Sequence, residues 1–122
     1  MKLRSVLVMT MLAAGLALSA FAANIDGKWK ATFDTQMGEQ HYTYTLKADG
    51  EKLTGTAQND RGTVEIADGT IKGDEVSFVE NLEFNGNKIA ITYTGKISGD
   101  EIKLTRKVGD FATEELVAKR EK

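Results

Sequence analysis

Ile71-Lys72-Gly73-Asp74-Glu75-Val76-Ser77-Phe78 is repeated, 26 residues later, as Ile97-Ser98-Gly99-Asp100-Glu101-Ile102-Lys103-Leu104. In both copies an alternation of apolar and polar residues runs into Gly-Asp and resumes after it. Gly and Asp tolerate the backbone of a tight hairpin turn, and alternation at period two is typical of a half-buried strand. The repeat therefore predicts that one antiparallel hairpin unit is used more than once, as in a β-meander that closes into a small barrel.

The same alternation continues on both sides of the repeat and predicts eight consecutive strands. Their inward positions are mostly apolar or aromatic, and their outward positions carry Lys, Thr, Asp and Glu. Eight short strands joined by tight turns favour an all-β fold, an eight-stranded antiparallel up-and-down barrel. A β-sandwich is the alternative, and it requires a long crossover loop that the spacing does not show. The expected strands are 27–34, 40–47, 52–58, 62–71 with a bend at Asp68-Gly69, 75–84, 88–96, 101–108 and 113–121.

The first 22 residues have the pattern of an export signal and are expected to lie outside the folded domain. Lys2 and Arg4 precede an apolar run, 6–18, that is shorter than a bilayer-spanning helix. Because Ala20-Phe21-Ala22 is a small-x-small cleavage site, we predict a signal peptide over 1–22 that is cleaved near Ala22. A retained membrane anchor is the alternative. Residues 23–122 then form a single β-barrel domain, exported as a soluble protein to the periplasm or the extracellular space.

The composition of this exported domain makes some classes of binding partner unfavourable. Without Lys2 and Arg4, the 16 basic residues of the chain fall to 14 against 18 acidic residues, a net charge of −4. Such a surface disfavours nucleic acid and anionic membranes. The chain has no Cys and no Pro, so its stability has to come from packing and from uninterrupted strands. The oligomeric state and any protein partner stay open.

Gly27-Lys28-Trp29 on the first expected strand resembles the Gly-x-Trp motif of the calycin superfamily, which includes lipocalins and avidins. In those families the Trp packs at the closed end of the barrel, often under an Arg from the last strand. The resemblance implies those roles for Trp29 and Arg120. Leu53-Thr54-Gly55-Thr56 also resembles an avidin-like second hairpin. Avidins line their pocket with several Trp, whereas this chain has only Trp29, so the resemblance implies a lipocalin-like fold and no particular ligand.

The region 23–122 as a whole is more similar to a group of short secreted bacterial domains of unassigned function. Those domains combine this Trp, a Leu-Thr-Gly-Thr strand and repeated Gly-Asp turns with a final Ala-Lys-Arg, which Ala118-Lys119-Arg120 matches. This resemblance again implies a fold and leaves the ligand open.

Motifs for catalysis and for metal binding are weak. His41 is the only histidine, and its phase places it on the outer face beside inward Tyr42. One His and no Cys do not make a usual zinc site, and the spacing of a calcium loop is missing around Asn59-Asp60. We expect no metal, no cofactor and no catalytic residue. Glu80 with Tyr42 nevertheless leaves open an enzyme that isomerises or cyclises a small substrate.

Two charged residues on the inward phase indicate a pocket. Glu80 and Arg106 are costly inside a barrel unless they are paired or wet. A structural ion pair between them, or a bulge that turns one of them outward, is the alternative to a polar contact within a pocket. Topology places both toward the end of the barrel opposite Trp29. The predicted ligand site there consists of Tyr42, Glu80, Phe84, Arg106 and Phe111, with Val108 lining the same mouth and Met37 overhanging it.

The sequence therefore predicts an exported, lipocalin-like protein that binds a small apolar or amphipathic ligand at the open end of the barrel. The alternative is a filled barrel that serves as an interaction or accessory module and binds a protein or a polysaccharide through its Thr- and Lys-rich outer face. An eight-stranded barrel is just wide enough either to be filled by its own side chains or to hold one small ligand, so both hypotheses stay open.

Overall fold

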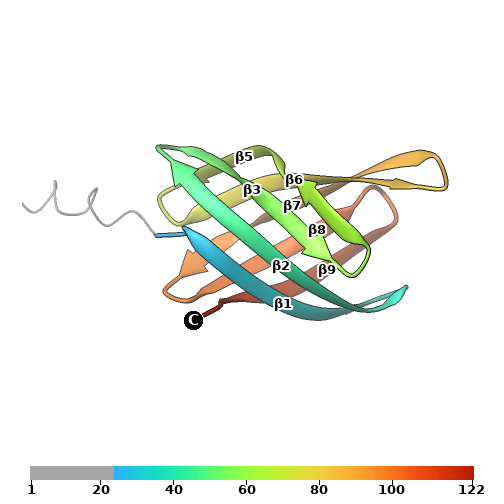
Figure 1. Ribbon diagram of the computed structural model, residues 1–122, viewed down its shortest axis with the longest axis horizontal. Helices are drawn as coiled ribbons and strands as arrows, with labels where there is room; N and C mark the ends of the chain where they lie inside the picture. The colour runs from blue at the N-terminus through green and yellow to red at the C-terminus, as the bar shows by residue number, and fades with distance from the viewer. Residues whose placement is uncertain (1–23) are drawn as a thin grey trace, which may run out of the picture.

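Nine antiparallel strands form a closed sheet in the computed structural model, which describes residues 24–122 except for the side chain of Phe84 (Figure 1). Eight of these strands form the barrel, which closes where β1 pairs with β9. Closure rules out the β-sandwich. The predicted signal peptide, 1–22, lies outside the described residues. The strands are β1 (Gly27–Thr35), β2 (Gly38–Asp49), β3 (Lys52–Asn59), β4 (Gly62–Glu65), β5 (Ala67–Lys72), β6 (Glu75–Phe84), β7 (Asn87–Ser98), β8 (Glu101–Val108) and β9 (Ala112–Arg120).

The predicted inward phase is confirmed by the core. Alternate residues of each long strand are buried, and Trp29, Tyr44, Phe78 and Tyr93 have no exposed surface. Ile25, which precedes β1, is also completely buried and extends the core toward one end of the barrel. No helix of the described part of the chain is long and apolar enough to span a membrane.

Both copies of the repeated motif form two-residue hairpin loops. Lys72 pairs with Glu75 across the first loop, and Ser98 pairs with Glu101 across the second. The glycine that opens each loop has nearly the same conformation, with φ of 61° in one copy and 62° in the other. A positive φ at the first central position is the requirement of a type II′ turn, and Gly meets it without a steric penalty. The prediction of a hairpin unit used twice is therefore confirmed.

The predicted single strand 62–71 is wrong in one respect, because the structure divides it into β4 and β5 at Ile66. Asp68 has a φ of 51°, and the pairing of β5 with β6 shifts register between Ala67 and Thr70. An irregularity of this kind bends a strand and ends its pairing. As a result, β4 stays with β3 while β5 turns to join β6.

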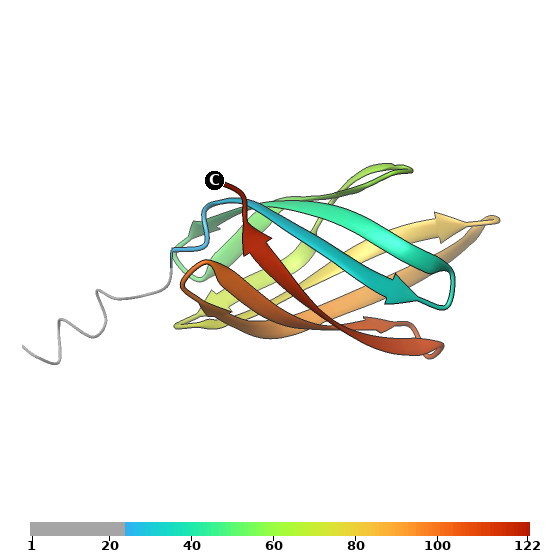
Figure 2. The same cartoon turned by 90° about the horizontal axis from the view of Figure 1, so that it is seen from below.

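This break leaves the barrel wall open on one side. β6 pairs with β5 only as far as Val79, and β4 pairs only with β3 among the described strands. The β3–β4 hairpin and the β6–β7 hairpin separate toward the same end of the barrel (Figure 2). The last residues of β6 therefore pair with β7 on one side and, within residues 24–122, have no paired strand on the other.

The start of β1, which carries Trp29, and the end of β9, which carries Arg120, lie together at the opposite end of the barrel (Figure 1). The guanidinium carbon of Arg120 is 4.3 Å from the centroid of the Trp29 ring. Arg120 also donates hydrogen bonds to the carbonyl oxygens of Asn24 at 2.6 Å and Asp26 at 2.9 Å, and Trp29 Nε1 donates to the Ile25 carbonyl at 2.9 Å. These contacts tie the residues before β1 to the last strand and close this end of the barrel.

Candidate ligand-binding site

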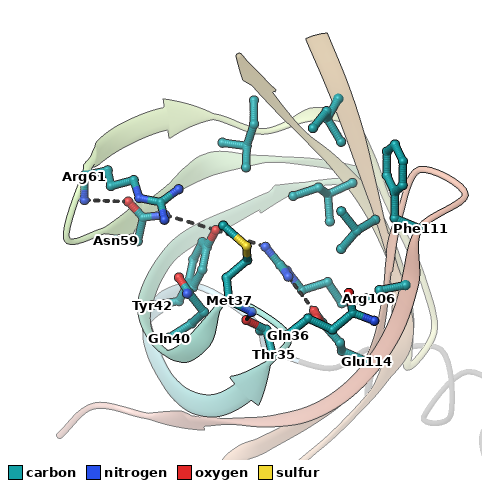
Figure 3. Close-up of a pocket in the computed structure, with 15 residues that line it drawn as sticks. Thr35, Gln36, Met37, Gln40, Tyr42, Asn59, Arg61, Arg106, Phe111 and Glu114 are labelled. Carbon is teal, nitrogen blue, oxygen red and sulfur yellow. Dashed lines mark hydrogen bonds and ion pairs between the residues drawn. The ribbon is translucent and has the colours of Figure 1, made fainter. Parts of the chain in front are cut away.

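The end of the barrel opposite Trp29 holds a cavity of about 380 Å³ (Figure 3). Residues of the β1–β2, β3–β4 and β8–β9 turns surround its mouth, and Met37 and Phe111 there are both largely exposed. The wall supplied by β6, β7 and β8 is apolar, whereas β2, β3 and the β3–β4 turn supply polar groups. The apolar side consists of Leu82, Ile89, Ile91, Val108 and Phe111, and the polar side includes Gln40, Tyr42, Asn59 and Arg61.

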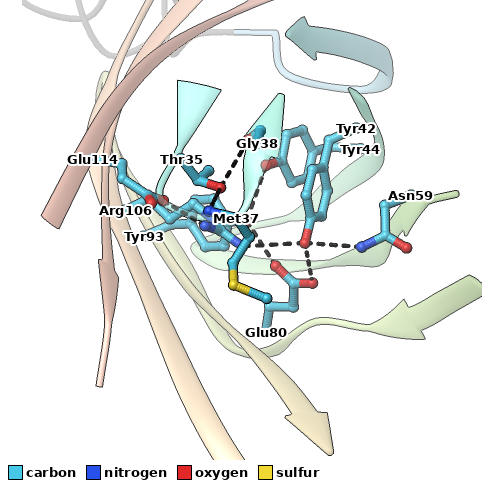
Figure 4. A network of polar contacts seen from close by, with 10 residues as sticks. All are labelled: Thr35, Met37, Gly38, Tyr42, Tyr44, Asn59, Glu80, Tyr93, Arg106 and Glu114. Atoms are coloured by element: carbon cyan, nitrogen blue, oxygen red, sulfur yellow. Dashed lines mark hydrogen bonds and ion pairs between the residues drawn. The ribbon is translucent and has the colours of Figure 1, made fainter. Parts of the chain in front are cut away.

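Beneath the cavity, a buried carboxylate is held by two tyrosines (Figure 4). Glu80 is 1% exposed and accepts hydrogen bonds from the hydroxyl of Tyr42 at 2.8 Å and from that of Tyr93 at 2.7 Å. Tyr44 in turn donates to the Tyr93 hydroxyl at 3.0 Å. Both carboxyl oxygens of Glu80 thus have a hydrogen-bond partner, which offsets the cost of burying this polar group.

Arg106 occupies the centre of this arrangement and is itself 6% exposed. Its Nη1 contacts Glu114 at 2.5 Å, its Nε donates to Tyr93 at 3.0 Å and its Nη2 donates to Tyr42 at 3.2 Å. The guanidinium also lies 5.3 Å from the centroid of the Phe33 ring, within the range of a cation–π contact. We call the five residues Tyr42, Glu80, Tyr93, Arg106 and Glu114 the polar floor.

The ion pair between Glu80 and Arg106, one of the alternatives that the sequence left open, does not form directly. The ion-pair partner of Arg106 is Glu114, and Glu80 reaches Arg106 only through the hydroxyls of the two tyrosines. Glu80 and Arg106 are both buried, so a bulge that turns either of them outward is also ruled out.

The surroundings of the buried tyrosines and of Arg106 shift the pKa values of these groups. Burial raises the pKa of Tyr42, Tyr44 and Tyr93 above the ordinary value of 10.0, and the negative charge of Glu80 adds to the effect. Burial alone lowers the pKa of Arg106, but its contacts with Tyr93, Tyr42 and Glu114 outweigh that effect and leave the pKa raised. All three phenols are therefore neutral and Arg106 is charged at physiological pH.

Side chains fill the barrel between the polar floor and the closed end. The rings of Phe78 and Tyr93 stack with centroids 4.5 Å apart, and Tyr44 meets both of them edge-on at 5.9 and 5.5 Å. Tyr42 stacks on Tyr44 at 5.3 Å. The described interior is thus packed at the Trp29 end and hollow at the other, so the filled and the hollow barrel of the sequence analysis each describe one part of the molecule.

The structure brings together several of the predicted site residues. Tyr42, Arg106 and Phe111 line the cavity, as do Val108 and Met37. Glu80 belongs to the polar floor but does not line the cavity, and it is linked to the lining residues Tyr42 and Arg106 through the Tyr42 and Tyr93 hydroxyls. The side chain of Phe84 lies outside the part of the chain that the structure describes.

The sequence analysis missed several polar residues of the site, and Glu114, Asn59 and Arg61 are examples. Glu114 pairs with Arg106, Asn59 donates to the Tyr42 hydroxyl at 3.1 Å, and Arg61 stands at the rim. The alternation of the strands could have identified two of them. Glu114 lies two residues before inward Leu116, and Asn59 lies two residues after inward Ala57, so both positions face inward. Glu114 and Asn59 were missed because each was treated as part of a strand end or a turn.

Groups for metal or nucleophilic chemistry do not gather in this site. No cluster of three or more His, Cys, Asp or Glu side chains within residues 24–122 is arranged to hold a metal ion. His41 lies on the outer face, 3.2 Å from the hydroxyl of Thr32 and 3.2 Å from Glu39. No protein-family model, curated protein or solved structure matches the chain, so the role of the cavity has to be argued from its own residues.

Proposed function

We propose that this protein is an exported, lipocalin-like carrier that binds a small amphipathic molecule in the cavity at the open end of the barrel. The observation that carries the proposal is the cavity of about 380 Å³ with an apolar wall above a buried polar floor. Its volume lies within the range of small-molecule sites, which combine mostly apolar linings with a few convergent polar groups. The export pattern over 1–22 supports a role outside the cytoplasm.

The composition of the floor supports binding over a purely structural role. A buried Arg and carboxylate are often no more stabilising than well-packed apolar residues of the same volume. An apolar plug between β2, β6 and β8 would therefore hold the barrel equally well. Polar groups retained beneath an open apolar cavity are what the orientation of an amphipathic ligand requires.

Thermal unfolding of the purified protein with a mixed library of lipids, sugars, aromatic acids and haem-like compounds tests the proposal. A ligand that binds only the native state raises stability by about 2.7 kcal/mol at one hundred times its Kd. Ile89→Trp fills the cavity from its apolar wall and is expected to abolish the increase in melting temperature. Thr92→Trp places the same side chain on the exposed outer face of the same strand, β7, and should leave the increase intact.

A cooperatively folded protein whose melting temperature responds to no compound would contradict the proposal. The same holds for a response that Ile89→Trp and Thr92→Trp share equally, since it would place binding outside the cavity. Either result would favour the alternative, an interaction module that meets a protein or a polysaccharide through its Thr- and Lys-rich outer face.

A further inference from the structure

The hydroxyl groups of the polar floor have no capacity left for a ligand. A phenol has one O–H to donate and two lone pairs to accept with. Tyr42 donates to Glu80 and accepts from Asn59 and Arg106. Tyr93 donates to Glu80 and accepts from Tyr44 and Arg106. A ligand that enters the cavity therefore cannot be recognised by either phenol.

Arg106, in contrast, has hydrogen-bond donors left for a ligand. A guanidinium carries five N–H groups, and Arg106 uses one for each of its contacts with Tyr93, Glu114 and Tyr42 within the described residues. Arg106 lines the cavity, and two of its N–H groups have no partner among the described residues, so they are the donors that the floor can offer to a ligand. The polar group of the ligand is therefore expected to be a hydrogen-bond acceptor.

The formal charge of the floor decides which kind of acceptor fits. Two carboxylates, the buried Glu80 and the partly buried Glu114, surround one guanidinium, that of Arg106, and Glu114 already pairs with it at 2.5 Å. An anionic ligand would bring a third carboxylate to a single buried cation, where repulsion is weakly screened. Arg61 is the other cation that lines the cavity, but it is exposed at the rim and its charge is screened by solvent.

We infer that the cavity selects a ligand whose polar group is an uncharged hydrogen-bond acceptor, such as the carbonyl of an amide or a ketone, over a carboxylate of the same chain length. This inference rests on the proposed function and names its ligand class. At about 30 Å³ for each water-sized group, the cavity holds about a dozen non-hydrogen atoms. A saturated chain of about ten carbons with one polar end is therefore the matched probe.

The test compares the Kd values of decanamide, 2-undecanone, decanoate and decylamine at pH 7, measured by calorimetry on the full purified protein below micelle-forming concentrations. We expect decanamide and 2-undecanone each to bind at least fivefold tighter than decanoate and decylamine. A smaller ratio, or tightest binding by either charged probe, would overturn the inference while leaving the carrier proposal intact. If none of the four probes binds, the inference fails, and the thermal unfolding test with the mixed library separately decides the carrier proposal.

A charge-neutralising variant tests the stated cause. Glu114→Gln keeps an acceptor for Arg106 but removes one of the two carboxylates. We expect decanoate to bind this variant at least fivefold tighter than it binds the wild type, and decanamide to change by less than threefold. An unchanged preference for decanamide would refute charge as the cause. Arg61→Gln is the control at the rim, and a selective loss of decanoate affinity there would place an anionic head on Arg61 and also refute the inference.

Discussion

The hydroxyl groups of two interior tyrosines, Tyr44 and Tyr93, differ in the number of hydrogen bonds that they form. Tyr44 and Tyr93 are both completely buried and lie in the same aromatic cluster. Within residues 24–122, the Tyr44 hydroxyl forms a hydrogen bond only with that of Tyr93, whereas the Tyr93 hydroxyl also bonds to Glu80 and Arg106. Replacement of either residue by Phe removes one oxygen atom and leaves the ring in place. Any difference between the two variants therefore measures the polar floor.

The magnitude follows from the groups that each change leaves unpaired. Tyr44→Phe removes one neutral hydrogen bond and is expected to lower the free energy of unfolding by about 0.5 to 1.5 kcal/mol. Tyr93→Phe removes two bonds to charged groups, at about 1.5 to 3 kcal/mol each, as well as the bond from Tyr44. We expect a loss of about 3.5 to 7.5 kcal/mol, a large part of the about 5 to 15 kcal/mol that stabilises a small domain.

Urea unfolding followed by the fluorescence of Trp29 measures both losses. Trp29 is the only tryptophan in the chain and is completely buried at the closed end, so its emission reports global unfolding rather than a local change at the floor. The dependence on urea should stay the same for all three proteins, which is the sign that only stability has changed. Losses that agree within about 0.5 kcal/mol would refute the reasoning, because the extra partners of Tyr93 would then contribute nothing.

Three further outcomes are expected. Folding raises the pKa values of Tyr42, Tyr44 and Tyr93, so these phenols lose their protons at a lower pH in the unfolded chain than in the folded one. Their contribution to the free energy of unfolding is therefore complete below about pH 10 and falls above it by about 1.4 kcal/mol per pH unit for each phenol. Alkaline unfolding followed by tyrosinate absorbance measures this loss. Arg120→Met removes the guanidinium over the Trp29 ring and two hydrogen bonds to carbonyl oxygens, and it should lower the free energy of unfolding in urea by about 2 to 4 kcal/mol. The control Lys30→Met breaks only the exposed ion pair with Glu121 and should lower it by less than about 0.5 kcal/mol. A Cβ atom at Gly95 would lie 1.9 Å from a backbone carbonyl oxygen of β8, so Gly95→Ala should sharply reduce the yield of folded protein. The control is Thr94→Ala. If Gly95→Ala melts at the same temperature as this control, the register of β7 with β8 is contradicted.

The strand pattern was predictable because it depends on local chemistry. Apolar alternation placed Trp29, Tyr44 and Phe78 on the inward face, and the structure buries all three. The repeated Gly-Asp turns followed from the backbone that each loop requires. The bend at Asp68 was predicted, but the division of 62–71 into two strands was not, because it depends on β4 pairing with β3 alone while β5 pairs with both β3 and β6.

The candidate site was predictable only in part, for a related reason. Phase alone placed Tyr42, Glu80 and Arg106 in the interior, and topology assigned them to one end of the barrel. Neither could say which charged groups meet. Glu114 was overlooked beside Arg106, although both residues occupy the inward phase of adjacent strands and are paired in register.

Residue order by itself determined which side chains enter the barrel, because the alternation of a strand is a property of a few neighbouring residues. Tertiary structure alone decided how the buried charges are compensated. Glu80 and Arg106 lie 26 positions apart in the chain, and both contact Tyr42, which is a further 38 positions before Glu80. Contacts of such long range depend on the register of every intervening strand and on the break at Ile66, so the polar floor and the cavity above it exist only once the barrel has closed.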